Sequence, residues 1–205
     1  MRRYRELLGV PGVPRLTLAV LLSRVTTSMM NLAVLVAVTG SHGYAEAGLV
    51  MLAFALSNAV VGPARGRLAD RHEPRRVLLG LLAGHLVAYA GLFACLSTTA
   101  PIAILFLAAA LLGVTVPPAG PVVRGAWPNL VPESRLPTAY AFDAALNTAT
   151  FVSGPLVAGG LLLVLPAAGA LAVTGVLKAA GDTMVALAPA IRRPAGPAPA
   201  HRARG

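Results

Sequence analysis

The sequence is poor in charged residues and in cysteine, and both shortages narrow the kind of protein it can encode. Charged residues make up only 12% of the 205 residues, about half the share of an ordinary soluble domain. Cys95 is the single cysteine, so the chain cannot form a disulfide within itself. Because Cys95 lies inside a long apolar run, we expect a small buried side chain rather than a redox group. The composition therefore argues against a soluble globular domain.

Motifs for catalysis and cofactor binding are also missing. The sequence has no paired-cysteine redox site, no His–Glu zinc helix and no Ser–His arrangement with the spacing of a known hydrolase. It also lacks a glycine-rich phosphate loop with its lysine, so we do not expect the chain to use ATP. We therefore expect no enzyme activity, no catalytic residue, no metal and no cofactor.

Long apolar blocks are what the chain does contain, since 57% of its residues are hydrophobic. A bilayer requires about 20 mostly apolar residues for each helical crossing, because unpaired backbone groups cannot remain in hydrocarbon. The sequence therefore predicts an all-α polytopic membrane protein with six transmembrane helices in one bundle. The predicted spans are Leu16–Thr39, Ala45–Ala64, Val77–Ser97, Ile102–Val116, Thr138–Leu165 and Ala168–Ile191.

Three regions follow from this pattern. Residues 1–15 form a cytoplasmic N-terminal segment, and residues 16–191 form the six-helix transmembrane bundle. Residues 192–205 are basic and rich in Pro, Ala and Gly, which predicts a disordered cytoplasmic tail or linker.

Positive charge is distributed on one side of the predicted spans. The formal net charge is +10, but no basic stripe with interleaved aromatic residues occurs, so we do not expect nucleic-acid binding. The fifteen cations outside the spans fall on one side of the bilayer, as the positive-inside bias predicts: Arg2, Arg3, Arg5, Arg15, Arg65, Arg67, Arg71, Arg75, Arg76, Arg124, Arg135, Arg192, Arg193, Arg202 and Arg204. High Ala, Gly and Arg with almost no Lys is typical of a GC-rich bacterial source. We therefore expect a multi-pass protein of the cell (inner) membrane with both termini in the cytoplasm.

The polar segment between the second and third spans carries the most specific motif. It resembles the signature loop of the major facilitator superfamily, usually Gly-x-Leu-Ala-Asp-Arg-x-Gly-Arg-Arg/Lys-x-x-Leu, and it matches at Gly66, Leu68, Ala69, Asp70, Arg71, Arg75 and Leu78. Glu73 and Pro74 depart from the pattern, at a glycine and at an arginine. A glycine allows two helices to meet closely, and an aspartate at a helix end can neutralise N–H dipoles and arginines. The alternative is that the arginines only anchor a turn to anionic headgroups.

A second resemblance lies in the fifth span, in the segment around Gly154, Pro155 and Gly159. The family's proton-coupled drug antiporters carry Gly-Pro-x-x-Gly-Gly there, whereas this chain has one extra residue before the glycine pair. We interpret these residues mainly as a helix kink and as close packing, with an antiporter signature as the alternative. The antiporters also have an arginine inside the fourth span, and the predicted fourth span has none.

Both resemblances cover only six of the family's usual twelve helices, so the chain looks like the N-terminal half of such a transporter. They imply secondary active transport of a small molecule, with efflux as the favoured direction. They also imply a second six-helix half as partner, which is a missing C-terminal half, a second copy or another chain. The alternative function is a non-transporting six-helix subunit or truncated remnant that binds another membrane protein.

Polar residues inside the spans are the candidates for cavity or coupling sites, because a charge in hydrocarbon costs several kcal/mol unless it faces a partner or a cavity. Arg24 lies near the middle of the first span, and Asn31 lies two turns further along the same helix. The resemblance implies that this helix lines the substrate cavity, which makes both residues candidate ligand contacts. An ion pair between Arg24 and Asp143 is the equally weighted alternative.

Asp143 and Asn147 are four residues apart in the fifth span and share one helical face, so they complete the candidate set. Asp143 could also be a solvated carboxylate near the cytoplasm. Lys178 and Asp182 are four residues apart in the sixth span and could neutralise each other. The resemblance places that helix outside the cavity, so we interpret the pair as structural, and His85 as a hydrogen-bonded core histidine.

Overall fold

The structure is a computed structural model that describes residues 2–98 and 100–192. Every regular element in this part of the chain is helical. The elements are α1 (Arg2–Leu8), α2 (Val13–His42), α3 (Tyr44–Arg71), α4 (Pro74–Ser97), α5 (Ile102–Thr115), α6 (Ala119–Ala126), η1 (Trp127–Asn129), η2 (Glu133–Arg135), α7 (Leu136–Val164), α8 (Ala167–Leu187) and η3 (Pro189–Arg192).

Six helical segments of the described chain are long and apolar enough to cross a membrane. They are Val13–His42, Tyr44–Arg71, Pro74–Ser97, Ile102–Asn129, Glu133–Val164 and Ala167–Leu187. The predicted all-α fold with six spanning helices is therefore confirmed.

Glycine and proline set the ends of these helices. Gly43 alone separates α2 from α3, and its φ of +100° is a left-handed conformation that other residues rarely adopt. Pro74 begins α4, where its missing N–H costs little because the first N–H groups of a helix have no partner within it. Pro117 and Pro118 separate α5 from α6, because neither has an N–H to continue the helical hydrogen bonds.

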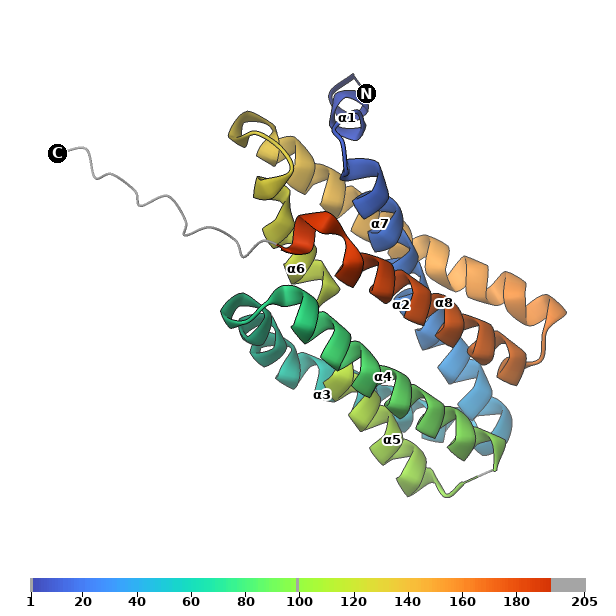
Figure 1. The fold of residues 1–205 in the computed structure, drawn as a ribbon. Helices are drawn as coiled ribbons and strands as arrows, with labels where there is room; N and C mark the ends of the chain where they lie inside the picture. Colours follow the sequence, from blue (N-terminus) through green and yellow to red (C-terminus); the bar gives the residue numbers. More distant parts are fainter. Residues whose placement is uncertain (1, 99, 193–205) are drawn as a thin grey trace.

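The helices form two groups that pack into one bundle (Figure 1). In one group α2 packs against α7 and α8, and in the other α5 packs against α3 and α4. The groups meet where α4 contacts α8 and where α2 contacts α3. A Cβ on Gly181 of α8 would lie 2.7 Å from the backbone nitrogen of Ser23 in α2. This glycine therefore allows α8 and α2 to approach at backbone distance.

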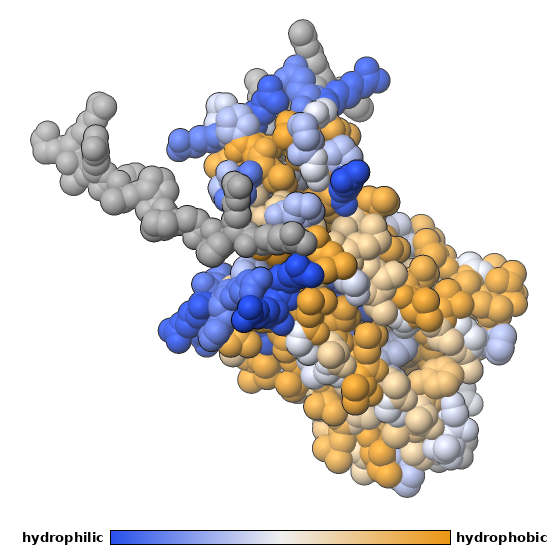
Figure 2. All heavy atoms as spheres, in the orientation of Figure 1, coloured by the Kyte–Doolittle hydropathy of each residue, from blue (hydrophilic) through white to orange (hydrophobic). Residues whose placement is uncertain are grey.

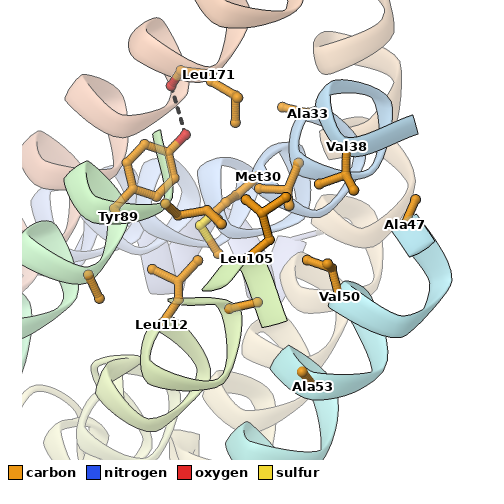
Figure 3. Close-up of a cluster of buried hydrophobic side chains, with 14 residues drawn as sticks. Met30, Ala33, Val38, Ala47, Val50, Ala53, Tyr89, Leu105, Leu112 and Leu171 are labelled. Atoms are coloured by element: carbon orange, nitrogen blue, oxygen red, sulfur yellow. Dashed lines mark hydrogen bonds between the residues drawn. The ribbon is translucent and has the colours of Figure 1, made fainter. Parts of the chain in front are cut away.

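One half of the bundle has a largely apolar core. Its buried cluster draws on α2, α3, α4, α5 and α8 and includes Met30, Val50 and Leu105 (Figure 3). Tyr89 brings the only strongly polar group among the residues of that cluster, and its hydroxyl donates a hydrogen bond of 2.7 Å to the carbonyl oxygen of Leu171. A buried hydroxyl with a partner does not weaken an apolar core.

Hydrophilic residues gather at the opposite end of the bundle. Figure 2 shows them over α1 and over the turn between α3 and α4, while hydrophobic residues cover most of the remaining visible surface. That turn consists of His72 and Glu73 only. The exposed apolar side chains include Val60, Leu156 and Leu163, which suits helices that face lipid tails.

Two of the predicted span boundaries are wrong. The second span does not stop at Ala64, since α3 continues to Arg71. The fourth span does not stop at Val116, since the chain resumes as α6 and η1 after the two prolines and the segment ends at Asn129. Charged residues and prolines lower the apolar score and so predict the ends of spans, whereas both helical segments continue past them.

Candidate functional site

An ion pair between α2 and α7 is the centre of the candidate site. The Nη2 atom of Arg24 lies 2.8 Å from Oδ1 of Asp143, and Nη1 donates a hydrogen bond of 3.1 Å to the backbone oxygen of Asp143. Asp143 is buried, with 1% of its side chain exposed, whereas 12% of the Arg24 side chain is exposed. The structure therefore contains the ion pair that the sequence offered as one of two alternatives for Arg24.

A second arginine reaches the same carboxylate from α6. The Nε atom of Arg124 lies 3.2 Å from Oδ2 of Asp143 and donates a hydrogen bond to it. The expectation that Arg124 lies in a loop, and that the fourth span contains no arginine, is wrong. The span continues beyond its proline break, and α6 carries Arg124 to α7.

The resulting network of Arg24, Asp143 and Arg124 is partly open. Two guanidinium groups share one carboxylate, so the network keeps one net positive charge. The side chain of Arg124 is 62% exposed, and Arg24 lies roughly 16 Å along α2 from its first residue at 1.5 Å per residue. A charged group at that depth requires water or a polar partner beside it. The network can therefore bind a polar ligand or exchange an ion-pair partner.

The two asparagines of the candidate set lie differently. Asn147 is one helical turn beyond Asp143 in α7, and it is half-buried. Asn31 lines a small apolar pocket between α2, α3, α4 and α5 with Met30, Phe54 and other residues. Its buried Oδ1 atom has no hydrogen-bond partner among the described residues. Asn147 thus lies one turn from the ionic network, with no side-chain hydrogen bond to it among the described residues, and Asn31 belongs to a separate pocket.

A second buried ion pair lies on the other side of α2. The Nζ atom of Lys178 is 2.7 Å from Oδ2 of Asp182, and both side chains are at most 3% exposed. Ser23 of α2 donates a hydrogen bond to the other oxygen of Asp182. The buried His85 ring in α4 lies 3.4 Å from the hydroxyl of Thr115 in α5. The described residues contain no cluster of three or more His, Cys, Asp or Glu side chains that could hold a metal ion.

Arg65 is a functional candidate that the sequence reasoning missed. The sequence predicts that Arg65 lies outside the spans, but it lies within α3 and is only 6% exposed. Its guanidinium donates hydrogen bonds to the carbonyl oxygens of Gly113, Val114 and Val116 at the end of α5. The adjacent Pro117 and Pro118 were a signal that carbonyl groups would be free there, but the sequence did not indicate which donor would reach them.

The signature residues between the second and third spans are largely helical. Gly66, Leu68, Asp70 and Arg71 lie in the last turns of α3, and Arg75 lies in the first turn of α4. Asp70 is exposed, and within residues 2–98 and 100–192 no ion pair involves its carboxylate. The short turn has no positive φ, which explains why Glu73 can replace the glycine usual in this motif.

Gly154, Pro155 and Gly159 all lie within α7. A Cβ on Gly154 would lie 2.2 Å from the Cβ of Ser28, so α7 and α2 touch closely at this position. A Cβ on Gly159 would meet no atom within 4 Å. Only the first of these two glycines therefore packs against another part of the described chain.

Comparison with known proteins adds an independent line of evidence. The family profile described as Major Facilitator Superfamily matches residues 16–205. The chain is 33% identical over 167 residues to a protein of Sinorhizobium fredii named uncharacterized MFS-type transporter y4rN. That alignment covers 78% of this chain and only 40% of the relative. No solved structure matches the chain.

Proposed function

This chain belongs to the major facilitator superfamily, and we propose that it forms one half of a secondary active transporter for a small molecule. The family consists of integral membrane transporters rather than enzymes. In the proposed mechanism, this bundle and a second one rock about a site near the middle of the membrane, which opens alternately to each side. We further propose that the protein lies in the cell (inner) membrane with both termini in the cytoplasm, and that it exports its substrate.

The partly open network of Arg24, Asp143 and Arg124 is the observation that carries this proposal. It joins α2, α6 and α7, and it leaves one net positive charge at a depth where lipid tails would otherwise lie. Charged groups inside membrane spans are rare and often mark substrate or ion pathways, and this network differs from a closed structural pair in its exposed third member. The carboxylate can hold both guanidinium groups in one state and release one of them to a ligand in another. Such a switch is what a binding site in an alternating-access transporter requires.

A second helical bundle is the proposed partner. Two charged groups have room for further polar partners. One is the exposed face of the Arg124 guanidinium, and the other is the carboxylate of Asp70, for which no ion pair is found in the described residues. A second bundle with polar groups and helix ends at these positions would supply such partners. The second bundle can come from a continuing chain, a second copy or another polypeptide.

Flux in proteoliposomes tests the proposal. The purified chain is reconstituted at increasing protein-to-lipid ratios, and export is followed for a panel of solutes with ethidium as the drug-like member. We expect flux that Asp143→Asn abolishes and that Glu133→Gln leaves unchanged, because Glu133 is an exposed carboxylate outside the network. If two copies form the transporter, flux rises more steeply than in proportion to protein density.

The alternative outcome identifies a different function. If no solute of the panel moves at any density, while the chain copurifies with a second membrane protein, the transport proposal is wrong for this chain acting alone. The chain is then a membrane subunit that binds another bundle.

A further inference from the structure

The break between α5 and α6 leaves two backbone carbonyl groups without their usual donors. In a continuous helix each N–H bonds to the carbonyl four residues earlier, so residues 117 and 118 would serve Gly113 and Val114. Both positions are proline and have no N–H. Inside a membrane a carbonyl without a partner is costly, because no water is available to replace the bond. The break therefore requires donors from elsewhere in the bundle.

Arg65 of α3 supplies these donors. Its Nη1 atom lies 2.9 Å from the oxygen of Gly113 and 3.1 Å from that of Val114, the two carbonyls that the prolines release. The same nitrogen lies 2.7 Å from the oxygen of Val116. Its Nη2 atom bonds to both oxygens of Asn58, about two turns earlier in α3. One guanidinium thus replaces two missing N–H groups and is held in place by its own helix.

The charge of Arg65 is compensated by dipoles rather than by an acid. Within the described residues no ion pair involves it, and it is 6% exposed. The last carbonyl groups of a helix carry partial negative charge, which favours a cation beside them. The end of α5 therefore provides both hydrogen-bond acceptors and an electrostatic counterpart for this buried cation.

Close backbone contact fixes α5 against α3 at the same level. A Cβ on Gly113 would lie 2.1 Å from the hydroxyl oxygen of Ser57 and 2.4 Å from the backbone oxygen of Phe54. No side chain fits at position 113 without moving one of the helices. The end of α5 is thus held within reach of Arg65, and the direction of the chain after the break decides where α6 lies.

We infer that Arg65 holds the proline break of the fourth span and thereby positions Arg124 of α6 beside Asp143. The route runs from the guanidinium of Arg65 to the end of α5, across Pro117 and Pro118, and along α6 to Arg124. Arg65 is a positioning residue in this arrangement and touches none of the three members of the ionic network. The inference concerns the bundle itself, so it stands whether or not the chain transports a solute.

A double-mutant cycle in purified protein tests the first step. Arg65→Met removes the donors, and Pro117→Ala with Pro118→Ala restores the N–H groups that would serve the same carbonyls. We expect Arg65→Met to lower the melting temperature in detergent by about 5–10 °C, and to lower it by less than half as much when both prolines are alanine. Arg67→Met is the matched control, since Arg67 is an exposed arginine two residues away in α3. Arg67→Met should lower the melting temperature only slightly, and by the same amount whether positions 117 and 118 are proline or alanine.

A distance measurement tests the second step. Spin labels at Leu107→Cys in α5 and Gly125→Cys in α6, both exposed, report the angle between the two helices in a Cys95→Ala protein. Arg65→Met should broaden or shift this distance, Arg65→Lys should give an intermediate result, and Arg67→Met should leave it unchanged. Arg65→Lys also keeps the test informative if the methionine variant does not fold, because a single ammonium replaces only part of the guanidinium.

Two results would overturn the inference. One is an equal loss of melting temperature from Arg65→Met with and without the prolines, which would show that the guanidinium does not replace their N–H groups. The other is an unchanged distance between the labels in both Arg65 variants, which would show that α6 is positioned without it.

Discussion

Two neighbouring residues of α2, Ser23 and Arg24, each contact a buried carboxylate, and the two carboxylates have different surroundings. Arg24 points to Asp143 of α7, in a network whose third member, Arg124, is 62% exposed. Ser23 points to Asp182 of α8, whose partner Lys178 is 3% exposed. The first network is open and has one net positive charge, while the second is closed and neutral. Burial of an acid in a membrane span therefore does not by itself indicate function, and the state of its partners separates the two cases.

The closed pair should give the largest loss of stability when it is broken. Lys178→Met leaves the charge of Asp182 buried without a cation, which we expect to cost about 3–5 kcal/mol of unfolding free energy. The double variant Lys178→Met with Asp182→Leu removes both charges and should lose less than the single variant. Thermal unfolding in detergent measures both values. A double variant at least as unstable as the single one would contradict a closed structural pair.

Packing beside the open network should give the next largest effect. Gly154→Ala places a methyl group 2.2 Å from the Cβ of Ser28, so α7 must move away from α2. We expect a loss of about 1–3 kcal/mol and a weaker contact between Arg24 and Asp143. Gly159→Ala is the matched control in the same helix and should cost nothing, since no atom lies within 4 Å of the added group. Equal losses would mean that the two helices are not in contact at Gly154.

The open network should respond mainly in function. Asp143→Asn keeps an oxygen that can accept from Arg24, and it keeps the backbone carbonyl that Arg24 already contacts. We therefore expect a stability loss of about 1–2 kcal/mol, below that of Lys178→Met, together with loss of flux in proteoliposomes. A stability loss as large as that of Lys178→Met would remove the distinction between the two networks.

The most exposed member should matter least for stability. Arg124 lies at the exposed edge of the network, and Arg24 stays beside Asp143 without it, so Arg124→Gln should cost less than about 0.5 kcal/mol of unfolding free energy. The same substitution should still change flux, because it removes one of the two cations that share Asp143. If unfolding showed a loss comparable to that of Asp143→Asn, Arg124 would be a structural rather than an exchangeable partner.

The sequence was sufficient for the fold and for part of the site. Apolar run lengths predicted the six spans, and the depth of Arg24 predicted a partner for it, with Asp143 among the alternatives. Hydropathy placed Arg65 and Arg124 outside the spans, because a charged residue lowers the apolar score wherever it lies. The structure shows that backbone carbonyls released by proline can accommodate one of these arginines inside the bundle, and that a buried acid holds the other.

Contacts between helices that are far apart in the chain could not be predicted from the sequence either. Lys178 and Asp182 are four residues apart, so their pairing was predictable from helical geometry. The hydrogen bond from Ser23 was not, because 159 residues separate it from Asp182 and only the packing of α2 against α8 brings them together. The hydrogen bonds from Arg65 to the end of α5 were unpredictable for the same reason, because 48 to 51 residues separate the partners.

The most direct test of the difference between the two networks is the labelling rate of one cysteine beside each of them. In a Cys95→Ala protein reconstituted in lipid, Asn147→Cys lies one turn from Asp143, and Thr174→Cys lies one turn from Lys178. A membrane-impermeant thiol reagent should label position 147 at least about tenfold faster than position 174, which becomes reactive only when the helices separate. Equal rates, or faster labelling at position 174, would contradict the assignment of an open network at Asp143 and a closed pair at Asp182.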